Sequence, residues 1–161
     1  MLNFAIIGCG RIANKVVDGI ISNSEKAKLV AVCDILEDKM QQIKNRYIEK
    51  SNVLDEVIEV PDYKKVLEKI KIDVAIISTE SGYHEEIGLY FLENGVNIII
   101  EKPIAMSIQG AQKLLDMAKK KNLKLAACHQ NRFNYPIQLL KKAIKENRLG
   151  RIFNGMARIL W

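Results

Sequence analysis

Residues 8–13 read Gly8-Cys9-Gly10-Arg11-Ile12-Ala13, which is a G-x-G-x-x-A pattern. An apolar run precedes it at residues 4–7, and spacing typical of a helix follows it. In that setting the first glycine permits a tight turn, the second lets the backbone approach a pyrophosphate, and the alanine lets helix and strand pack closely. The N-terminus of such a helix also supplies N–H donors and the positive end of a dipole. The turn therefore predicts a dinucleotide site.

Strand and helix patterns alternate outward from this turn. Short apolar runs predict strands over residues 3–8, 28–33, 57–60, 74–78, 97–100 and 124–128. Helical spacing predicts helices over about 12–22, 37–49, 61–70, 84–94, 107–121 and 134–147. Apolar strands separated by helices indicate a parallel sheet that is covered on both faces. The expected fold class is α/β, with a doubly wound parallel sheet of the Rossmann type.

The alternation changes near residue 131. We expect a dinucleotide-binding domain over residues 1–130, followed over 131–161 by the first helix and strand of a truncated C-terminal α+β domain. The last strand is expected over residues 151–161. Without the rest of its sheet it would be an exposed apolar edge, so we expect it to be disordered, to pack on a neighbouring molecule or to exchange between copies.

Composition narrows the class of protein. The chain has 161 residues, of which 48% are hydrophobic and 27% charged, as in ordinary soluble domains. No apolar run approaches the roughly 20 residues of a membrane span. Because a strand pattern begins at residue 3, we expect no signal or transit peptide. The net charge of +6 comes without aromatic interleaving or a recognition-helix signature. We therefore expect neither a membrane nor a nucleic-acid partner.

Three cysteines, Cys9, Cys33 and Cys128, lie in or beside apolar strand patterns. Their spacing fits neither a metal site nor a disulfide framework. We interpret them as buried, reduced thiols of a cytoplasmic protein.

Small, polar or ionisable residues follow five of the expected strands, where ligands bind in open α/β sheets, and the first of these is the glycine turn. Asp34 follows the second strand and is placed to accept hydrogen bonds from the adenosine ribose. Its carboxylate would repel a 2′-phosphate, which favours NAD over NADP. Ser78-Thr79, Glu101-Lys102-Pro103 and His129-Gln130 follow later strands. Each alone is also compatible with a helix cap, a solvated turn or a satisfied histidine, but together they predict one site.

The segment Glu101-Lys102-Pro103 is the expected chemical centre. A lysine that follows a buried strand can be partly desolvated, which lowers its pKa toward the range for proton transfer. Lys102 could also hold a substrate hydroxyl by a charge-assisted hydrogen bond. Glu101 could accept from ribose hydroxyls on the nicotinamide side. In alcohol oxidation the cofactor accepts the hydride, and protein groups orient the reactants.

These residues make the chain similar to the amino-terminal part of the Gfo/Idh/MocA oxidoreductases. The resemblance rests on residues 8–13, 78–84, 101–105 and 132–133. It implies an NAD-dependent dehydrogenase that acts on a secondary alcohol of a sugar or nucleotide sugar, with Lys102 as the catalytic or substrate-orienting residue. The cofactor contacts are then expected from Gly8, Gly10, Arg11, Ile12, Asp34, Ser78, Thr79, His84, Glu101, Lys102 and Gln130.

Residues 78–84 and 129–134 further resemble the UDP-N-acetylglucosamine 3-dehydrogenase branch of this family. An inositol or free-sugar dehydrogenase and a non-catalytic dinucleotide sensor remain open alternatives. His84 is expected either to pack or cap the helix that follows it, or to contact the cofactor. His129 could approach the nicotinamide, although it does not match the family's acid/base histidine.

That acid/base histidine lies in a further domain of family members. The resemblance therefore implies that these 161 residues bind NAD but turn over sugars poorly or not at all. A homo-oligomer is expected for the full-length protein.

Overall fold

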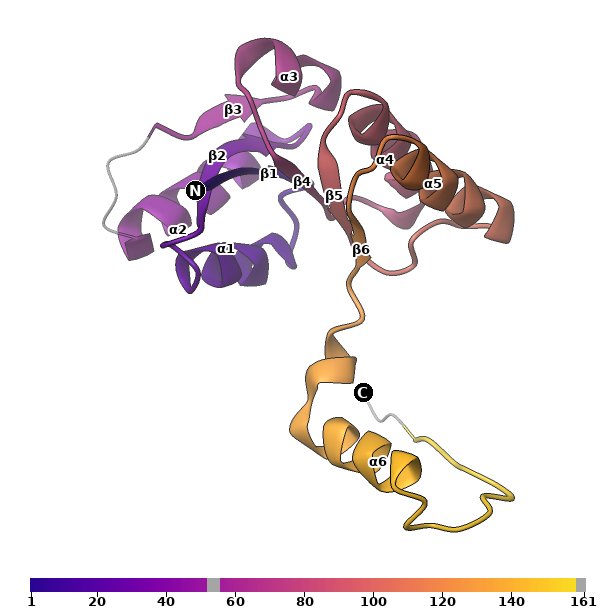
Figure 1. The fold of residues 1–161 in the computed structure, drawn as a ribbon. Helices are drawn as coiled ribbons and strands as arrows, with labels where there is room; N and C mark the ends of the chain where they lie inside the picture. The colour runs from indigo at the N-terminus through magenta and orange to yellow at the C-terminus, as the bar shows by residue number, and fades with distance from the viewer. Residues whose placement is uncertain (52–55, 159–161) are drawn as a thin grey trace. The chain divides into compact units, whose positions relative to one another are not determined.

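The computed structural model describes residues 1–51 and 56–158. The chain forms two compact units, one over Met1–Cys128 and one from His129 onward. Figure 1 shows the elements of each unit. The two are described separately below.

The first unit is built on one sheet of six parallel strands (Figure 1). The strands are β1 (Leu2–Ile7), β2 (Ala27–Cys33), β3 (Ile58–Val60), β4 (Val74–Ile77), β5 (Asn97–Ile100) and β6 (Leu125–Ala127). Their order across the sheet is β3-β2-β1-β4-β5-β6, so the direction of winding reverses between β1 and β4. The predicted α/β class with a doubly wound parallel sheet is confirmed.

The helices of this unit connect successive strands. They are α1 (Ala13–Ile21), α2 (Glu37–Ser51), α3 (Val66–Lys69), α4 (His84–Glu93) and α5 (Ile108–Lys120). The helix expected over 61–70 is instead a 3₁₀ turn, η1 (Tyr63–Lys65), followed by the short α3. Asp62 begins this turn, because its side chain accepts a hydrogen bond from the Lys64 N–H at 2.9 Å. Another 3₁₀ turn, η2 (Ser81–Tyr83), leads into α4.

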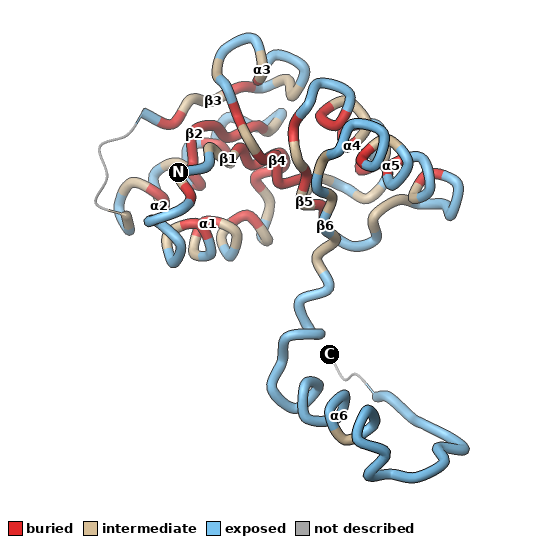
Figure 2. The backbone as a smooth tube through the Cα atoms, in the orientation of Figure 1, coloured by how far each residue is buried: buried red, intermediate tan, exposed pale blue. Residues whose placement is uncertain are grey.

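Two apolar clusters cover the two faces of the sheet. Ala5 and Ile7 of β1 belong to the cluster that includes residues of α4 and α5, whereas Ile6 belongs to the cluster with α1 and α2. Successive side chains of a strand point to opposite faces, so a strand buried on both sides must be apolar throughout. Figure 2 shows the resulting burial along the central strands.

The register of the central strands brings three loops together. Ile7 of β1 lies opposite Cys33 of β2 and Ile77 of β4. Backbone hydrogen bonds continue this alignment past the strands: the Gly8 N–H donates to the Cys33 carbonyl at 2.8 Å, and the Ser78 N–H donates to the Ile7 carbonyl at 2.7 Å. The residues that directly follow β1, β2 and β4 therefore meet at one edge of the sheet.

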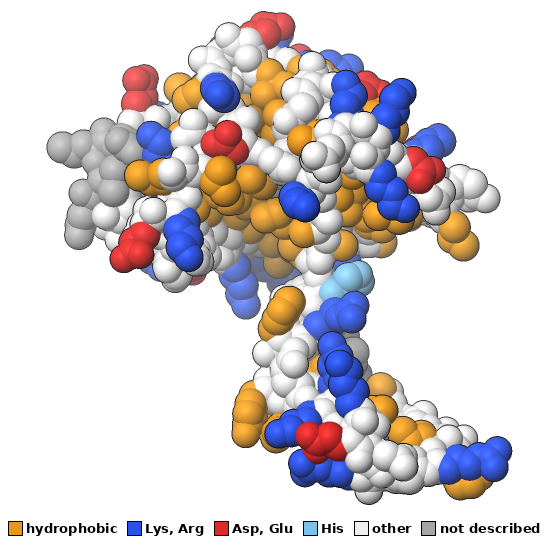
Figure 3. All heavy atoms as spheres, in the orientation of Figure 1, with side chains coloured by type: hydrophobic (Ala, Val, Ile, Leu, Met, Phe, Trp, Pro, Cys, Tyr) orange, Lys and Arg blue, Asp and Glu red, His pale blue; other side chains and the backbone are white. Residues whose placement is uncertain are grey.

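The second unit contains a 3₁₀ turn, η3 (Gln130–Phe133), and α6 (Tyr135–Lys145). The strand expected over 151–161 is wrong for its described part, since residues 151–158 form no strand; residues 159–161 lie outside the described chain. A strand needs a neighbour for its backbone hydrogen bonds, and the described residues of this unit offer none. Side chains of α6 leave apolar surface exposed beside lysines and arginines (Figure 3).

Cys9 and Cys33 are buried and Cys128 is half-buried, so the interpretation of three buried thiols is wrong for the last. All three are free. Within the two described ranges, no helix is both long and apolar enough to cross a membrane.

Candidate functional site

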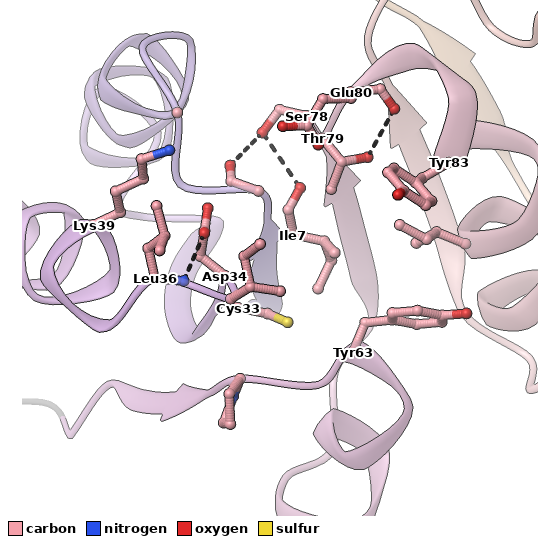
Figure 4. A pocket seen from close by; sticks show the side chains of 15 residues that line it. Ile7, Cys33, Asp34, Leu36, Lys39, Tyr63, Ser78, Thr79, Glu80 and Tyr83 are labelled. Carbon is pink, nitrogen blue, oxygen red and sulfur yellow. Dashed lines mark hydrogen bonds between the residues drawn. The ribbon is translucent and has the colours of Figure 1, made fainter.

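A cavity of about 400 Å³ opens at the edge where β1, β2 and β4 end (Figure 4). Of the predicted site residues, five line it: Gly8, Gly10, Asp34, Ser78 and Thr79. Each comes from a loop that follows one of these strands. The location is the one expected for ligands of doubly wound sheets, at the point where the strand order reverses.

The first glycine of the turn is required by geometry. Gly8 has φ +94°, and a Cβ built on it would lie 2.6 Å from the carbonyl carbon of Ser78 and from the nitrogen of Thr79. The Ser78 hydroxyl donates to the Gly8 carbonyl at 2.7 Å. The backbone of the turn therefore packs directly on the loop after β4. Gly10 differs, since a Cβ there would meet no atom within 4 Å.

Asp34 joins the glycine turn to the second helix. Its Oδ2 accepts from the Cys9 N–H at 2.7 Å, and its Oδ1 accepts from the Leu36 N–H at 3.0 Å. An ionised carboxylate offers about four acceptor sites, so capacity remains for ligand hydroxyls. In Figure 4 this side chain projects beside Leu36 and Lys39, across from Ser78 and Thr79.

The N-terminus of α1 provides a place for an anion. No side chain caps this helix, and its first turn carries no acidic residue. Its backbone dipole and first N–H groups are consequently available to a negatively charged ligand. Together with the glycine turn and Asp34, these features fit a dinucleotide: a pyrophosphate at the helix and a ribose at the carboxylate. Arg11 is exposed and Ile12 half-buried, and neither lines the cavity.

Several lining residues were not anticipated from the sequence. They are Ile7, Cys33, Ile35, Leu36, Lys39, Pro61, Tyr63, Glu80, Tyr83 and Ile87. Lys39 is the charged one nearest to Asp34 in sequence, in the first turn of α2. This lysine could have been predicted from the sequence, because the first turn of α2 follows the end of β2 and must lie at the same edge of the sheet.

The Glu101-Lys102-Pro103 loop follows β5, and its residues do not line the cavity. Lys102 is exposed, so the expected partial desolvation of its ammonium group is wrong. Glu101 is half-buried, and one of its oxygens accepts from the Lys102 N–H at 3.3 Å. The Lys102-Pro103 peptide bond is cis.

Cys128 lies next to this loop at the end of β6. Its N–H donates to the Ile100 carbonyl at 2.9 Å. Burial, the charge of Glu101 and a hydrogen bond from the thiol to that carboxylate raise the pKa of Cys128 to about 11. The thiol therefore stays protonated and serves as a hydrogen-bond donor to Glu101.

The remaining predicted residues lie elsewhere. His84 is buried at the start of α4, and both of its ring nitrogens face backbone carbonyl oxygens. It does not line the cavity, and its burial fits the packing alternative. Gln130 belongs to η3 of the second unit, where it is exposed.

Comparison with known proteins gives a consistent picture. A family model described as "Oxidoreductase family, NAD-binding Rossmann fold" matches residues 2–129. The D-glucoside 3-dehydrogenase of Escherichia coli strain K12 is 32% identical over 99% of this chain and 43% of its own length. The inositol 2-dehydrogenase of Rhizobium meliloti strain 1021 is 26% identical over 94% of this chain and 43% of its own.

Among solved structures, the WlbA dehydrogenase of Chromobacterium violaceum, in complex with NADH and UDP-GlcNAcA, superimposes with a TM-score of 0.84. It is 30% identical, and the match covers 94% of this chain and 42% of that one. The chain thus spans less than half the length of these relatives.

Proposed function

We propose that the protein that carries this chain oxidises a secondary alcohol of a sugar or nucleotide sugar. The premise is that the chain belongs to the Gfo/Idh/MocA oxidoreductase family and forms its NAD-binding Rossmann domain. The observation that carries the proposal is the cavity edge where Asp34 accepts a hydrogen bond from the glycine turn at 2.7 Å. This arrangement supplies the anion site and the ribose acceptor side by side.

The residues of this edge would each hold one part of NAD. Gly8 and Gly10 let the backbone come close to the pyrophosphate, and the N-terminus of α1 balances its charge. Asp34 accepts from the adenosine ribose hydroxyls and opposes a 2′-phosphate by charge repulsion, which favours NAD over NADP. When bound, the nicotinamide supplies the hydride acceptor.

Lys102 and Glu101 would serve the other end of the cofactor. The exposed ammonium of Lys102 is free to donate a charge-assisted hydrogen bond to a substrate hydroxyl and so fix its orientation. Glu101 would accept from the ribose on the nicotinamide side, with its carboxylate held by Cys128. We place the catalytic, substrate-orienting role on Lys102.

For the substrate, we propose the 3-hydroxyl of a UDP-linked N-acetylhexosamine or its uronic acid. The solved relative that contains UDP-GlcNAcA supports this class. A glucoside is the second candidate, because the similar curated relative is named as a D-glucoside 3-dehydrogenase. An inositol substrate has weaker support, from a relative at 26% identity.

A substrate panel with the full-length natural protein tests these assignments. NADH formation would be followed with UDP-N-acetylglucosamine, its uronic acid, a D-glucoside and myo-inositol, each with NAD and NADP. We expect turnover with a UDP sugar and NAD. Turnover with the glucoside alone would replace the first candidate by the second.

Replacing Lys102 separates an enzyme from a non-catalytic sensor. We expect Lys102→Ala to remove most turnover while NADH affinity changes little, whereas the matched surface variant Lys120→Ala leaves both unchanged. If Lys102→Ala affects neither property, the catalytic proposal is wrong.

A cytoplasmic location and a homo-oligomeric full-length protein remain predictions from the sequence. Cell fractionation would test the location, and light scattering would test the oligomeric state.

A further inference from the structure

His84 is the one polar or charged side chain that is fully buried in the described part of the chain, with 1% of its surface exposed. Its Nδ1 lies 2.7 Å from the carbonyl oxygen of Pro103, and its Nε2 lies 3.1 Å from the carbonyl oxygen of Thr79. A buried imidazole is favourable only when it is hydrogen-bonded. The two oxygens come from the loops after β5 and β4, so one ring joins two loops.

One of these loops lines the cavity, and the other carries the residue to which we assign the substrate-orienting role. Thr79 lines the cavity, and Pro103 directly follows Lys102. His84 itself is the first residue of α4, whose buried residues Ile87 and Phe91 pack in the core. The ring therefore connects the core to the loop after β4, which lines the cavity, and to the loop after β5, which carries Lys102.

Lys102 stands between two fixed points of the backbone. On one side, the Glu101 N–H donates to the Ile77 carbonyl of β4 at 2.9 Å, which continues the sheet. On the other side, the Pro103 carbonyl faces the Nδ1 of His84. Proline has no N–H of its own to donate, so this carbonyl is its backbone hydrogen-bonding group. Loss of the imidazole would release the loop on the side that follows Lys102.

We propose that His84 is a positioning residue: its Nδ1–H donates to the Pro103 carbonyl and thereby holds Lys102 in place relative to the cavity edge at Thr79. A carbonyl oxygen only accepts, so a hydrogen bond to the Pro103 carbonyl requires a proton on Nδ1. Of the two contacts, the one at Nδ1 is the shorter, at 2.7 Å against 3.1 Å. The proposal rests on the function proposed above, because Lys102 is the group that is positioned.

The protonation of the ring can be measured without any substitution. A long-range ¹H–¹⁵N spectrum of the 161-residue chain contains only two imidazoles, since the sequence has two histidines. We expect the ring nitrogens of His84 to show a proton on Nδ1, and the same state after NAD is added. A bare Nδ1 with the proton on Nε2 alone would overturn the proposal.

Two amide variants separate positioning from general packing. The amide nitrogen of His84→Asn falls near the place of Nδ1, and that of His84→Gln near the place of Nε2. In the full-length protein we expect His84→Asn to keep kcat within about 3-fold, and His84→Gln to lower it roughly 10- to 100-fold, with KM for NAD changed less than about 3-fold in both. Thermal unfolding would verify that both variants are folded.

The outcomes distinguish this inference from the proposed function. If Lys102→Ala abolishes turnover but the two His84 variants behave alike, His84 only fills space and the inference is wrong. If Lys102→Ala has no effect, the proposed function fails instead, although the ring would still show its proton on Nδ1. If a variant does not fold, the spectrum of the natural chain alone decides the hydrogen bond.

Discussion

Substituting the first glycine of the turn should damage the fold, whereas substituting the second should not. Gly8→Ala forces an alanine into a left-handed conformation with φ +94°, which costs about 1–2 kcal/mol. The added Cβ would also lie 2.6 Å from two backbone atoms of the Ser78-Thr79 segment, and overpacking of this kind costs about 1–3 kcal/mol. Backbone atoms cannot swing aside as a flexible side chain does. We expect a total loss of about 2–5 kcal/mol.

Gly10→Ala is the matched control. Its Cβ would meet no heavy atom within 4 Å, and its φ lies outside the left-handed region. We expect the free energy of unfolding to change by less than about 1 kcal/mol. If the pyrophosphate approaches this glycine, however, the methyl group occupies its place, and NADH affinity should fall at least about 10-fold, or about 1.4 kcal/mol.

Two measurements on the 161-residue chain test this pair. Urea unfolding followed by circular dichroism gives stability, and NADH fluorescence gives affinity. A domain of this size has a stability of about 5–15 kcal/mol, so the expected loss for Gly8→Ala is a large fraction of it. A Gly8→Ala protein as stable as the natural chain would refute the steric reasoning. Unchanged NADH affinity in Gly10→Ala would show that the pyrophosphate does not approach Gly10.

Three further predictions concern the cavity and the core. Asp34→Asn places an amide NH₂ group against one of the two backbone N–H donors that the carboxylate accepts from. NADH affinity should therefore fall roughly 10-fold, and the preference for NADH over NADPH should shrink. Titrations with both cofactors would measure these changes. Gly110→Ala puts a Cβ against the carboxylate of Glu85, which ends a flexible side chain and can swing aside, so urea unfolding should show a loss below about 1 kcal/mol. A loss as large as that of Gly8→Ala would contradict the distinction between side-chain and backbone clashes. Burial, followed by the charge of Asp34, raises the pKa of both Cys9 and Cys33 to about 12. At pH 8 we therefore expect their alkylation to be slower than that of a free thiol by roughly 1,000-fold, and mass spectrometry should show rapid labelling only after unfolding.

The parts of the fold that depend on local pattern could be predicted from the sequence. The run at residues 29–33 is apolar at every position because both faces of β2 are covered. The Ser107 cap of α5 was also predictable, and its hydroxyl accepts from the Gly110 N–H at 2.9 Å. The position of Asp34 at the site followed from the rule that ligands bind beyond the ends of parallel strands.

The parts that depend on tertiary contacts could not be predicted in the same way. The partner of Asp34, the Cys9 N–H, is 25 residues away, and no spacing rule gives that bond. The two carbonyls that face His84 lie 5 and 19 residues from it along the chain, in two different loops. The exposure of Lys102 likewise depends on what packs over its loop. The strand expected over 151–161 required a neighbour that the described residues do not provide.

The place of β1 in the sheet affects the time at which the domain can fold. Of the described strands, β1 comes first in the sequence but lies inside the sheet, and its neighbour β4 begins at Val74. Gly8 and Ser78, which close this pair, are 70 residues apart. At a synthesis rate of about 5–20 residues per second, the first strand waits roughly 4–14 s for that partner. Sheets that depend on such distant parallel pairs fold slowly, and β1 cannot be paired on both of its edges until β4 has been synthesised.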